Sequence, residues 1–434
     1  MNSITLRDAV HGDIYLTRQE TDLLDTVAMQ RLRGIRQLGT AFYVYPTAQH
    51  SRFEHCLGAC WMARCIVRRV ESEGGFPLPE VEKHAVCLAA LVHDVTHIPF
   101  GHTFEDERRL LERHDLSRSR YDRLIAGGEL GEKLRASEAG RLALKALAPD
   151  PEPAHTYLRD IVSGTICADL LDYLKRDNYF CGLSYRFDER IFHYFRVVDG
   201  RLTLALHKGC LLRRDALTEI TNLLRIRYVL SERVYYHHAK IASGVMVSKA
   251  VERALNCGLT EERLCRLTDD ALIHYLREHF AEDKPLTELL GDFCSRRLFK
   301  RCYMVSRSVG EEAVASLVRS YHLNEGGDRD AAEEQIARSL GVPAHRIAVY
   351  CAPPGMALKE ADVPVTMPAG DIQKLSSLNS AEIRILKDQH RALWKLYVFA
   401  SAHLEADLMR AGQVCEEVIG FPNELPAERA GNML

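Results

Sequence analysis

The stretch Leu88 to His102 reads LAALVHDVTHIPFGH, and the rest of the sequence is best interpreted from it. Five apolar residues lead into the adjacent pair His93 and Asp94, and His97 and His102 follow within ten positions. Polar side chains beside a buried segment are costly unless they are paired or bound to metal. The stretch therefore predicts a metal or catalytic site. A histidine-rich helix end that faces solvent is the alternative interpretation.

Composition indicates an ordinary globular protein. The chain has 434 residues, of which 47% are hydrophobic and 27% are charged, enough for one large domain with an appendage or for two domains. The net charge of -3 provides no overall positive field for nucleic acid. The start lacks a signal-peptide pattern, and no apolar run reaches the roughly 18 residues that cross a bilayer. We expect a cytoplasmic protein with no membrane partner.

Thirteen cysteines are scattered along the chain without any CxxC spacing. Such a dispersed, odd-numbered set is typical of reduced core thiols. Cys56 and Cys60 lie one helical turn apart, so a thiolate metal site is the competing hypothesis to two small buried hydrophobes.

Hydrophobic periodicity predicts a mainly α fold. Residues 4–16 are expected to form an extended arm or hairpin, and residues 192–198 and 202–206 a two-stranded ribbon. The pattern divides the chain into a helical core, residues 1–257, and a smaller α+β region, residues 258–434, with a regulatory or oligomerisation role. Helices are expected over 18–37, 52–73, 80–97, 105–148 with a break at Gly127-Gly128, 156–180, 213–255 and 380–411, and strands over 298–306, 346–351 and 363–367.

Two further polar residues lie among apolar helical neighbours. His55 occurs in SRFEHCLG and Asp169 in ADLLDYLKRD. With His93 and Asp94 they supply two imidazoles and two carboxylates, a donor set that suits a hard or borderline divalent metal. Four protein ligands leave room for water and a phosphate oxygen on an octahedral ion. Taken singly, His55 is also explained as a hydrogen-bonded structural residue, and Asp169 as a helix-surface carboxylate.

Several blocks of sequence carry a resemblance to a known family. They are DAVHGDIYL, LDTVAMQRLRGIRQLGTAFYVYPTAQHSRFEHCLG, LVHDVTHIPFGHTFE, DLLDYLKRDNYFCG and RVYYHHAK, which together cover roughly Asp8 to Lys240. In their order and spacing they resemble the HD-domain phosphohydrolases, and within them the deoxynucleoside triphosphate (dNTP) triphosphohydrolase branch. The resemblance implies an HD-domain helical core in which His55, His93, Asp94 and Asp169 hold a divalent metal ion (Mn, Fe, Zn, Ni or Mg).

The resemblance also implies an activity. Enzymes of this branch cleave a dNTP between the 5′ oxygen and the α-phosphorus, which releases deoxynucleoside and intact triphosphate. His102 occupies the position of the acid for the leaving oxygen, and His97 and His114 match other active-site histidines. Glu105, three residues after His102, is expected to orient its imidazole; an ordinary surface glutamate is the alternative.

Substrate contacts follow from the same resemblance. Gln37 and Asp177 match contacts to the sugar 3′-hydroxyl, and Tyr235 matches the side chain that excludes a 2′-hydroxyl, with Tyr173 as a further pocket wall. Core packing is the alternative for both tyrosines. Arg52 is expected to face phosphate, with Arg176 as a second candidate. Some relatives have a lysine for the triphosphate where this chain has Leu170; we consider Lys240 and His238 as substitutes.

A second nucleotide site is suggested by Asp25, Gln30 and Arg33, which match positions that read guanine in regulated, tetrameric relatives. A GTP or dNTP activator and a homo-oligomer, dimer or tetramer, are therefore expected. The basic residue of the amino-terminal arm is replaced by Ile4, with Arg7 as a partial substitute. A helix salt bridge is the competing explanation for the trio.

Three other functions remain open at this level. One alternative is an HD phosphohydrolase that acts on a monophosphate, cyclic or modified nucleotide. Another is a nucleotide sensor whose hydrolytic site has lost its activity. Direct nucleic-acid binding would use the basic clusters, although solvated surface is the alternative for these: Arg225 with Arg227, and Arg296, Arg297, Lys300 and Arg301.

Overall fold

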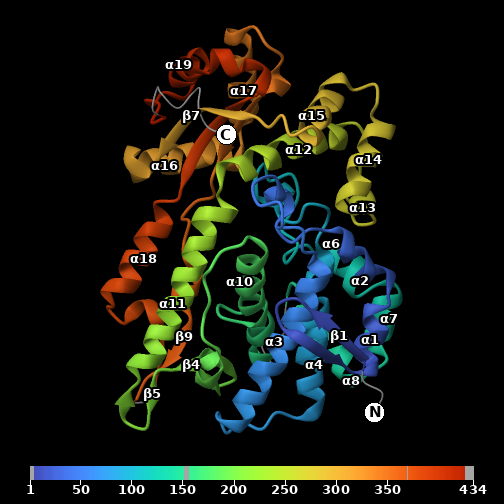
Figure 1. The fold of residues 1–434 in the computed structure, drawn as a ribbon, viewed down its shortest axis with the longest axis vertical. Helices are drawn as coiled ribbons and strands as arrows, with labels where there is room; N and C mark the ends of the chain where they lie inside the picture. Colours follow the sequence, from blue (N-terminus) through green and yellow to red (C-terminus); the bar gives the residue numbers. More distant parts are fainter. Residues whose placement is uncertain (1–3, 151–155, 369, 426–434) are drawn as a thin grey trace.

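The computed structural model describes residues 4–150, 156–368 and 370–425. The fold is mainly α-helical, as the sequence predicts, and Figure 1 shows small sheets among the helices. The helices of the first half are α1 (Arg18–Leu24), α2 (Val27–Arg31), α3 (Arg52–Ser72), α4 (Glu80–Val92), α5 (Thr103–Asp106), α6 (Arg118–Arg120), α7 (Gly128–Arg135), α8 (Glu138–Leu147), α9 (Thr156–Ser163), α10 (Ala168–Phe180), α11 (Arg214–Leu230) and α12 (His238–Asn256).

The second half contains shorter helices around a small sheet. Its α-helices are α13 (Glu261–Leu264), α14 (Asp269–His279), α15 (Lys284–Cys294), α16 (Glu311–Leu317), α17 (Asp328–Leu340), α18 (Ala381–Arg391) and α19 (Leu408–Ile419). The strands of the whole chain are β1 (Ile4–Asp8), β2 (Gly12–Leu16), β3 (Phe195–Val198), β4 (Arg201–Ala205), β5 (His207–Lys208), β6 (Leu211–Leu212), β7 (Lys300–Ser306), β8 (Ile347–Cys351), β9 (Pro364–Thr366), β10 (Ile372–Lys374) and β11 (Lys395–Ala400).

Three helices position the motif residues. α3 begins at a capping box, in which Ser51 and Glu54 satisfy each other's backbone amides, so its first turns are well defined. It packs against both α4 and α10. α4 ends at Val92, and a 3₁₀ turn, η3 (His93–Thr96), carries the histidine–aspartate pair. The motif therefore lies at a helix end that points into the interior.

The structure interrupts several predicted helices, and two of these interruptions are near the candidate site. Residues 18–37 form α1, α2 and a 3₁₀ turn, because Asp25 caps α1 and Thr26 restarts the chain in extended geometry. Residues 156–180 break after Ser163, and extended Cys167 precedes α10. The second break places Asp169 in the first turn of a new helix.

The single predicted helix over residues 380–411 is wrong. α18 ends at Arg391, and the run KLYVFA forms β11, the central strand of the sheet β7-β11-β8. Five of its six residues are buried, which is the character of a core strand covered on both faces. The expected hairpin over residues 4–16 and the ribbon of β3 and β4 are both present.

The two hydrophobic cores interleave along the sequence. β9 pairs in parallel with β4, so residues 364–366 complete a sheet begun at residue 195. One core joins α3, α4 and α10 to residues 358–386, and the other joins residues 98–104 and α12 to the second half. The expected boundary between residues 257 and 258 does not separate these cores.

Asp269 of α14 connects the second half to the loop that follows the HD motif. Its Oδ1 accepts from the backbone N–H of Phe100 at 2.7 Å, and its Oδ2 accepts from that of Arg36 at 3.0 Å. The side chain is fully buried, and burial raises its pKa to about 6. Phe100 and Gly101 both have positive φ, so this loop depends on fixed partners.

We expect Asp269→Asn to destabilise the fold. The asparagine amide has only one oxygen, so it can accept from only one of the two backbone N–H groups. The other N–H would face the amide NH₂, and an unsatisfied buried donor costs about 1–3 kcal/mol. The free energy of unfolding in urea measures this effect. The neighbouring Asp270→Asn is the matched control, because its side chain is 86% exposed. Equal stability of the two variants would contradict the assigned role.

Candidate active site

His55, His93, Asp94 and Asp169 converge from three separate helical segments. His55 Nε2 lies 3.0 Å from Asp169 Oδ1 and 3.8 Å from Asp94 Oδ2. His93 Nε2 lies 3.5 Å from Asp94 Oδ1 and 3.7 Å from Asp169 Oδ1. Two imidazole nitrogens and two carboxylates thus face one small volume.

The donor set fits a divalent cation. The Nε2 atoms of His55 and His93 are buried and form no hydrogen bond, while their Nδ1 atoms contact Asp172 Oδ2 at 2.7 Å and the Ala90 carbonyl at 2.8 Å. Partners on Nδ1 fix the tautomer and leave Nε2 with a lone pair for metal. These two orphaned nitrogens beside two carboxylates are the arrangement that a metal ion satisfies.

Electrostatics at this centre favour a cation. Burial raises the pKa of Asp94, but Arg52 and the neighbouring histidines outweigh it and hold the pKa well below its ordinary value. Burial similarly opposes ionisation of Asp169, whose pKa is lowered by His55 and His93. Burial lowers the pKa of His55, yet the adjacent Asp169 and Asp172 carboxylates raise it to about 10. The carboxylates remain ionised, and a metal ion would displace the imidazole proton.

Asp172 holds the candidate metal ligand His55 and is not among the residues predicted from the sequence. Besides His55, its carboxylate contacts His11 Nε2 at 2.6 Å and Arg176 Nε at 2.9 Å. Arg176 also donates to Asp8 Oδ2 at 2.9 Å and is fully buried. Arg176 does not line the cavity described below. It is the second candidate for a phosphate contact predicted from the sequence, but it instead helps to hold Asp172 in place. The only signal for Asp172 in the sequence is its spacing of three residues, about one helical turn, from Asp169.

Gly58 makes room for this support. A Cβ at this position would lie 1.8 Å from Asp172 Oδ1 and 2.4 Å from Arg176 Nη2. We expect Gly58→Ala to displace Asp172 and lower metal affinity roughly 10–100-fold, the usual effect of disturbing a ligand's hydrogen-bond partner. Titration with Mn²⁺ measures the affinity. Gly291→Ala in α15 is the control, because nothing lies within 4 Å of its Cβ position. Unchanged affinity in Gly58→Ala would contradict the support role.

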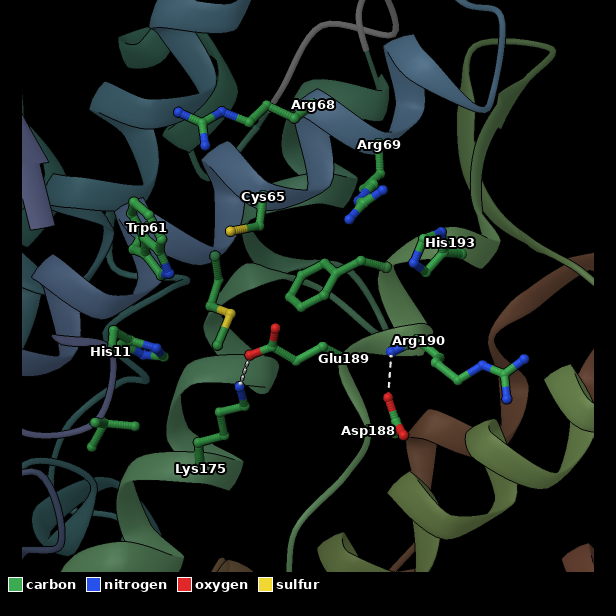
Figure 2. Close-up of a pocket in the computed structure, with 13 residues that line it drawn as sticks. His11, Trp61, Cys65, Arg68, Arg69, Lys175, Asp188, Glu189, Arg190 and His193 are labelled. Atoms are coloured by element: carbon green, nitrogen blue, oxygen red, sulfur yellow. Dashed lines mark hydrogen bonds and ion pairs between the residues drawn. The ribbon is translucent and has the colours of Figure 1, made fainter. Parts of the chain in front are cut away.

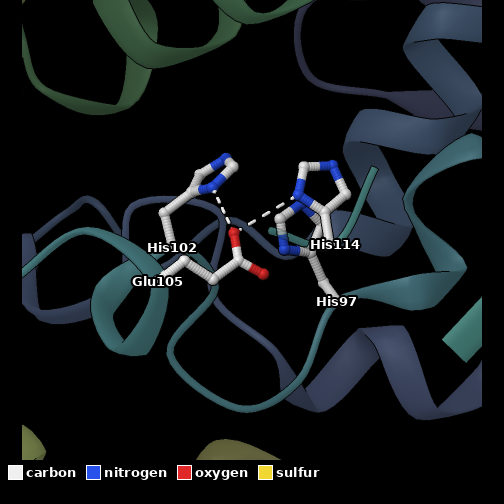
Figure 3. A group of neighbouring side chains, drawn as sticks. All are labelled: His97, His102, Glu105 and His114. Carbon is white, nitrogen blue, oxygen red and sulfur yellow. Dashed lines mark hydrogen bonds and ion pairs between the residues drawn. The ribbon is translucent and has the colours of Figure 1, made fainter. Parts of the chain in front are cut away.

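Next to the metal centre lies a group of three histidines and Glu105, shown in Figure 3. Glu105 Oε2 contacts His102 Nδ1 at 2.9 Å and His114 Nδ1 at 3.4 Å. Its other oxygen accepts from Arg120 at 2.9 Å. Burial raises the pKa of Glu105, but its two histidine partners outweigh it and hold the pKa below its ordinary value.

The three histidines differ in environment. The rings of His97 and His114 stack with centroids 3.6 Å apart, and burial lowers the pKa of both. Both nitrogens of His97 lack hydrogen bonds. The His102 side chain is 39% exposed and keeps its ionised carboxylate partner. His102 is therefore the imidazole best placed to meet a substrate as a proton donor, with Glu105 as its orienting partner.

A cavity of about 990 Å³ opens beside both groups. It brings together metal ligands, the His102 group and residues from both halves of the chain. Of the residues predicted to contact substrate, those that line it are Gln37, Arg52, Tyr173, Asp177, Tyr235 and Lys240. His238 does not line it and instead stacks on His237.

The predicted sugar contacts form one hydrogen-bonded group. Asp177 accepts from the Tyr235 hydroxyl at 2.6 Å and lies 2.9 Å from His50 Nε2. The buried Oε1 of Gln37 has no partner. The guanidinium of Arg227 lies over the rings of Tyr173 and Tyr235, at 5.5 and 4.9 Å. His50 is not among the residues predicted from the sequence. Arg227, predicted as part of a nucleic-acid cluster with Arg225, instead lines the cavity.

The predicted phosphate contacts are already engaged. Arg52 donates to Asp94 Oδ2 at 2.6 Å, and its Nε is buried without a partner. Lys240 donates to Glu107 at 2.6 Å. Leu170 is buried in the core and does not line the cavity. Phosphate binding here requires these cations to exchange or share their carboxylate partners.

The remaining predicted sites lie elsewhere. Asp25 and Arg33 are exposed, and no ion pair joins them within the part of the chain that the structure describes. Arg33 instead donates to Gln30 at 2.8 Å and lies over the Phe53 ring at 3.7 Å. The helix salt bridge considered for this trio is thus not formed, and the activator site stays a prediction.

Cys56 and Cys60 are both buried, but they do not form a shared site. Cys60 groups instead with Glu20 and Cys87. Among the described residues, no helix is long and apolar enough to cross a membrane.

Comparison with known sequences gives two family matches. A family described as an HD domain matches residues 52–177, and one described as an HD associated region matches residues 190–424. The uncharacterised protein YwfO of Bacillus subtilis is 29% identical over 320 residues, which are 68% of this chain and 70% of that protein. Deoxynucleoside triphosphate triphosphohydrolase SAMHD1 of Homo sapiens is 26% identical over 344 residues, 68% of this chain and 54% of that protein.

This chain spans about half the length of the curated triphosphohydrolases that it matches. Among solved structures, a hypothetical protein from Aquifex aeolicus matches with a TM-score of 0.72 and 23% identity, over 94% of this chain and 100% of that one. A phosphohydrolase from Bacteroides thetaiotaomicron matches with a TM-score of 0.69 and 23% identity, over 92% and 100%. These two likenesses establish the fold.

Proposed function

This chain belongs to the HD-domain phosphohydrolase family, and we propose that it hydrolyses dNTPs to deoxynucleoside and triphosphate. The observation that carries the proposal is one cavity lined by three of the four proposed metal ligands, His93, Asp94 and Asp169, and also by His102 and the Asp177–Tyr235 pair. The fourth proposed ligand, His55, lies behind them against Asp169. The curated relatives named as dNTP triphosphohydrolases support the same substrate class.

The chemistry divides between the metal and this chain's residues. When bound by His55, His93, Asp94 and Asp169, a divalent cation supplies Lewis-acid activation of phosphate and water. His102 donates a proton to the departing 5′ oxygen, and Glu105 holds its Nδ1 so that Nε2 faces the substrate. Arg52 reaches phosphate oxygens while it remains beside Asp94. His97 and His114, kept neutral by burial, form the wall behind His102.

A separate group of residues lining the cavity would select the sugar of the substrate. Asp177 and Gln37 offer acceptors to a 3′-hydroxyl, and we expect the Tyr235 ring to exclude a 2′-hydroxyl by steric contact. Tyr173 and Arg227 complete this wall. Lys240 lines the cavity and is the side chain that we assign to the outer phosphates, in place of the lysine that some relatives have where this chain has Leu170.

One incubation tests the proposal. The protein is supplied with all four dNTPs and Mn²⁺, with and without GTP, and the products are separated by chromatography. Deoxynucleoside with intact tripolyphosphate is the expected result. Monophosphate with pyrophosphate would overturn the assigned bond cleavage, and no product from any dNTP would favour the other nucleotide substrates or a sensing role. Parallel assays with Mg²⁺, Zn²⁺, Ni²⁺ and Fe²⁺ identify the preferred metal.

Regulation and assembly belong to the same proposal. We infer an activating nucleotide beside Asp25, Gln30 and Arg33, and a homo-oligomer in the cytoplasm, by analogy with regulated members of the branch. A higher hydrolysis rate with GTP, accompanied by a larger mass in light scattering, is the expected result. A rate and mass that do not respond to GTP would remove both inferences and leave the hydrolysis intact.

A further inference from the structure

A second pocket, which shares no lining residue with the cavity described above, is lined in part by His11, the residue that contacts Asp172. It has a volume of about 510 Å³ and is walled by the turn between β1 and β2, by α3, by α10 and by η5 (Glu189–Tyr194). Figure 2 shows its residues converging from these elements. We call it the rear pocket; the side chains that matter below are His11, Trp61, Arg69, Lys175, Asp188 and Glu189.

Cations dominate the rear pocket. Arg68, Arg69, Lys175 and Arg190 line it, against the carboxylates of only Asp188 and Glu189. Asp188 is committed to its own loop, where it caps η5 by accepting from the Arg190 amide at 2.8 Å. Glu189 is thus the one lining carboxylate, among the described residues, that is free to neutralise a lysine.

The pair formed by Lys175 and Glu189 is asymmetric. Their charged atoms are 3.0 Å apart, yet the Lys175 side chain is 20% exposed and that of Glu189 is 79% exposed. The Lys175 side chain is therefore largely buried against the protein, whereas the Glu189 side chain is largely surrounded by solvent. Exposed ion pairs of this kind contribute little stability, so another anion can replace the glutamate carboxylate at small cost.

The opposite wall adds a guanidinium and a flat ring. Arg69 projects from α3 toward the pocket in Figure 2. Its Nη1 also donates to Glu73 Oε1 at 2.8 Å. Trp61 lines the pocket, and the Arg68 guanidinium lies 6.0 Å from the centroid of its ring. Guanidinium and ammonium groups are the usual phosphate binders, and an indole is a stacking surface for a heterocycle.

We propose that the rear pocket binds a mononucleotide-class ligand. Its phosphate takes the place of the Glu189 carboxylate between Lys175 and Arg69, and its ring packs on Trp61. The identity of the hydrolysed substrate does not enter this argument, so the proposal stands or falls independently of dNTP cleavage.

The rear pocket is connected to the metal centre by two hydrogen bonds. His11 lines the pocket and lies 2.6 Å from Asp172 Oδ1, and Asp172 Oδ2 lies 2.7 Å from Nδ1 of the metal ligand His55. All three side chains are at most 2% exposed. A ligand that shifts His11 therefore changes how His55 is held, and by reciprocity metal binding changes the affinity for that ligand.

Binding is tested by calorimetry with AMP, ribose 5-phosphate and adenosine as probes. We expect AMP to bind best and adenosine worst. Lys175→Gln and Arg69→Gln should each weaken AMP binding about tenfold, the usual loss for one charged hydrogen bond. Glu189→Gln should strengthen it, because the competing carboxylate is gone. Trp61→Leu should reduce AMP to the affinity of ribose 5-phosphate.

Arg266→Gln is the matched control for Arg69→Gln, because both arginines pair with a glutamate one helical turn away at 2.8 Å. The control should bind AMP as the unaltered protein does. AMP binding that is the same in Lys175→Gln, Arg69→Gln and Glu189→Gln would overturn the site, as would adenosine binding as tightly as AMP. None of these measurements requires a hydrolysed substrate.

The connection is tested by Mn²⁺ affinity with and without saturating AMP. We expect a change of at least about fivefold, the lower end of typical coupling between sites. The change should vanish in Lys175→Gln, and in His11→Phe it should vanish while AMP still binds. A change that persists in Lys175→Gln would mean that AMP reaches the metal through the catalytic cavity, and would overturn the connection.

Discussion

Asp169→Asn is expected to abolish metal-dependent hydrolysis. Its Oδ1 is the oxygen closest to His55 Nε2, and it also faces His93. The amide removes one of two negative charges at the centre, and loss of the metal's roughly 4 kcal/mol of transition-state stabilisation lowers the rate about a thousandfold. Metal content after dialysis and the steady-state rate together measure the effect.

A carboxylate elsewhere on the surface controls for loss of charge. Asp122→Asn breaks an exposed pair with Arg118 at 2.9 Å and leaves the cavity untouched, so its rate should equal that of the unaltered protein. If Asp169→Asn retained metal and full activity, the reaction would not take place at this centre. If the unaltered protein bound metal but neither protein hydrolysed any nucleotide, the sensing role would be favoured.

Glu333→Gln is expected to cause the largest loss of stability. Glu333 of α17 is buried, accepts from Arg108 at 2.7 Å and from the Val349 amide at 2.9 Å, and also pairs with Lys249. Removing one partner of a buried ion pair leaves the remaining charges, here Arg108 and Lys249, buried without this counter-ion. This lowers the free energy of unfolding by about 3–5 kcal/mol. Urea unfolding measures this loss, and Glu334→Gln, at the exposed neighbouring position, should change little.

The loss should also depend on pH. Burial raises the pKa of Glu333, but Arg108 and Lys249 outweigh it and lower the pKa from 4.5 to about 2. Because the pKa is lower in the folded state, this stabilisation is complete above pH 4.5 and is lost as the pH falls toward 2. At 1.36 kcal/mol per pH unit the lost contribution is about 3 kcal/mol. The unaltered protein and Glu333→Gln should therefore converge in acid; a constant difference would contradict the ion-pair origin.

The sequence indicated which side chains converge at the candidate metal centre because their signal is local. The HD pair follows an apolar helix end, and His55 and Asp169 lie near the starts of helices that pack together. The hairpin over residues 4–16 and the β3–β4 ribbon were also predictable, since each joins strands that are adjacent in sequence.

What the sequence did not reveal depends on distant partners. The run KLYVFA follows a helical pattern closely enough to be assigned to a helix, and only pairing with β7 and β8 makes it a strand. In the sequence nothing distinguishes Arg227 from the other basic residues. Its place in the cavity wall is evident only from its contacts with the rings of Tyr173 and Tyr235. Asp172 needs His11, 161 positions away, before its role is evident. Such contacts are set by tertiary packing, which periodicity does not encode.

The cavity walls from the second half of the chain have a consequence for engineering. His322, Tyr350, Glu360 and His390 face the same space as the metal ligands. A fragment that stops at residue 257 would lose these walls along with the strand that completes the β3–β4 sheet. A fragment meant to keep the whole cavity therefore has to include both halves, and residues 350–360 are the segment to exchange between homologues when the cavity wall is to be altered.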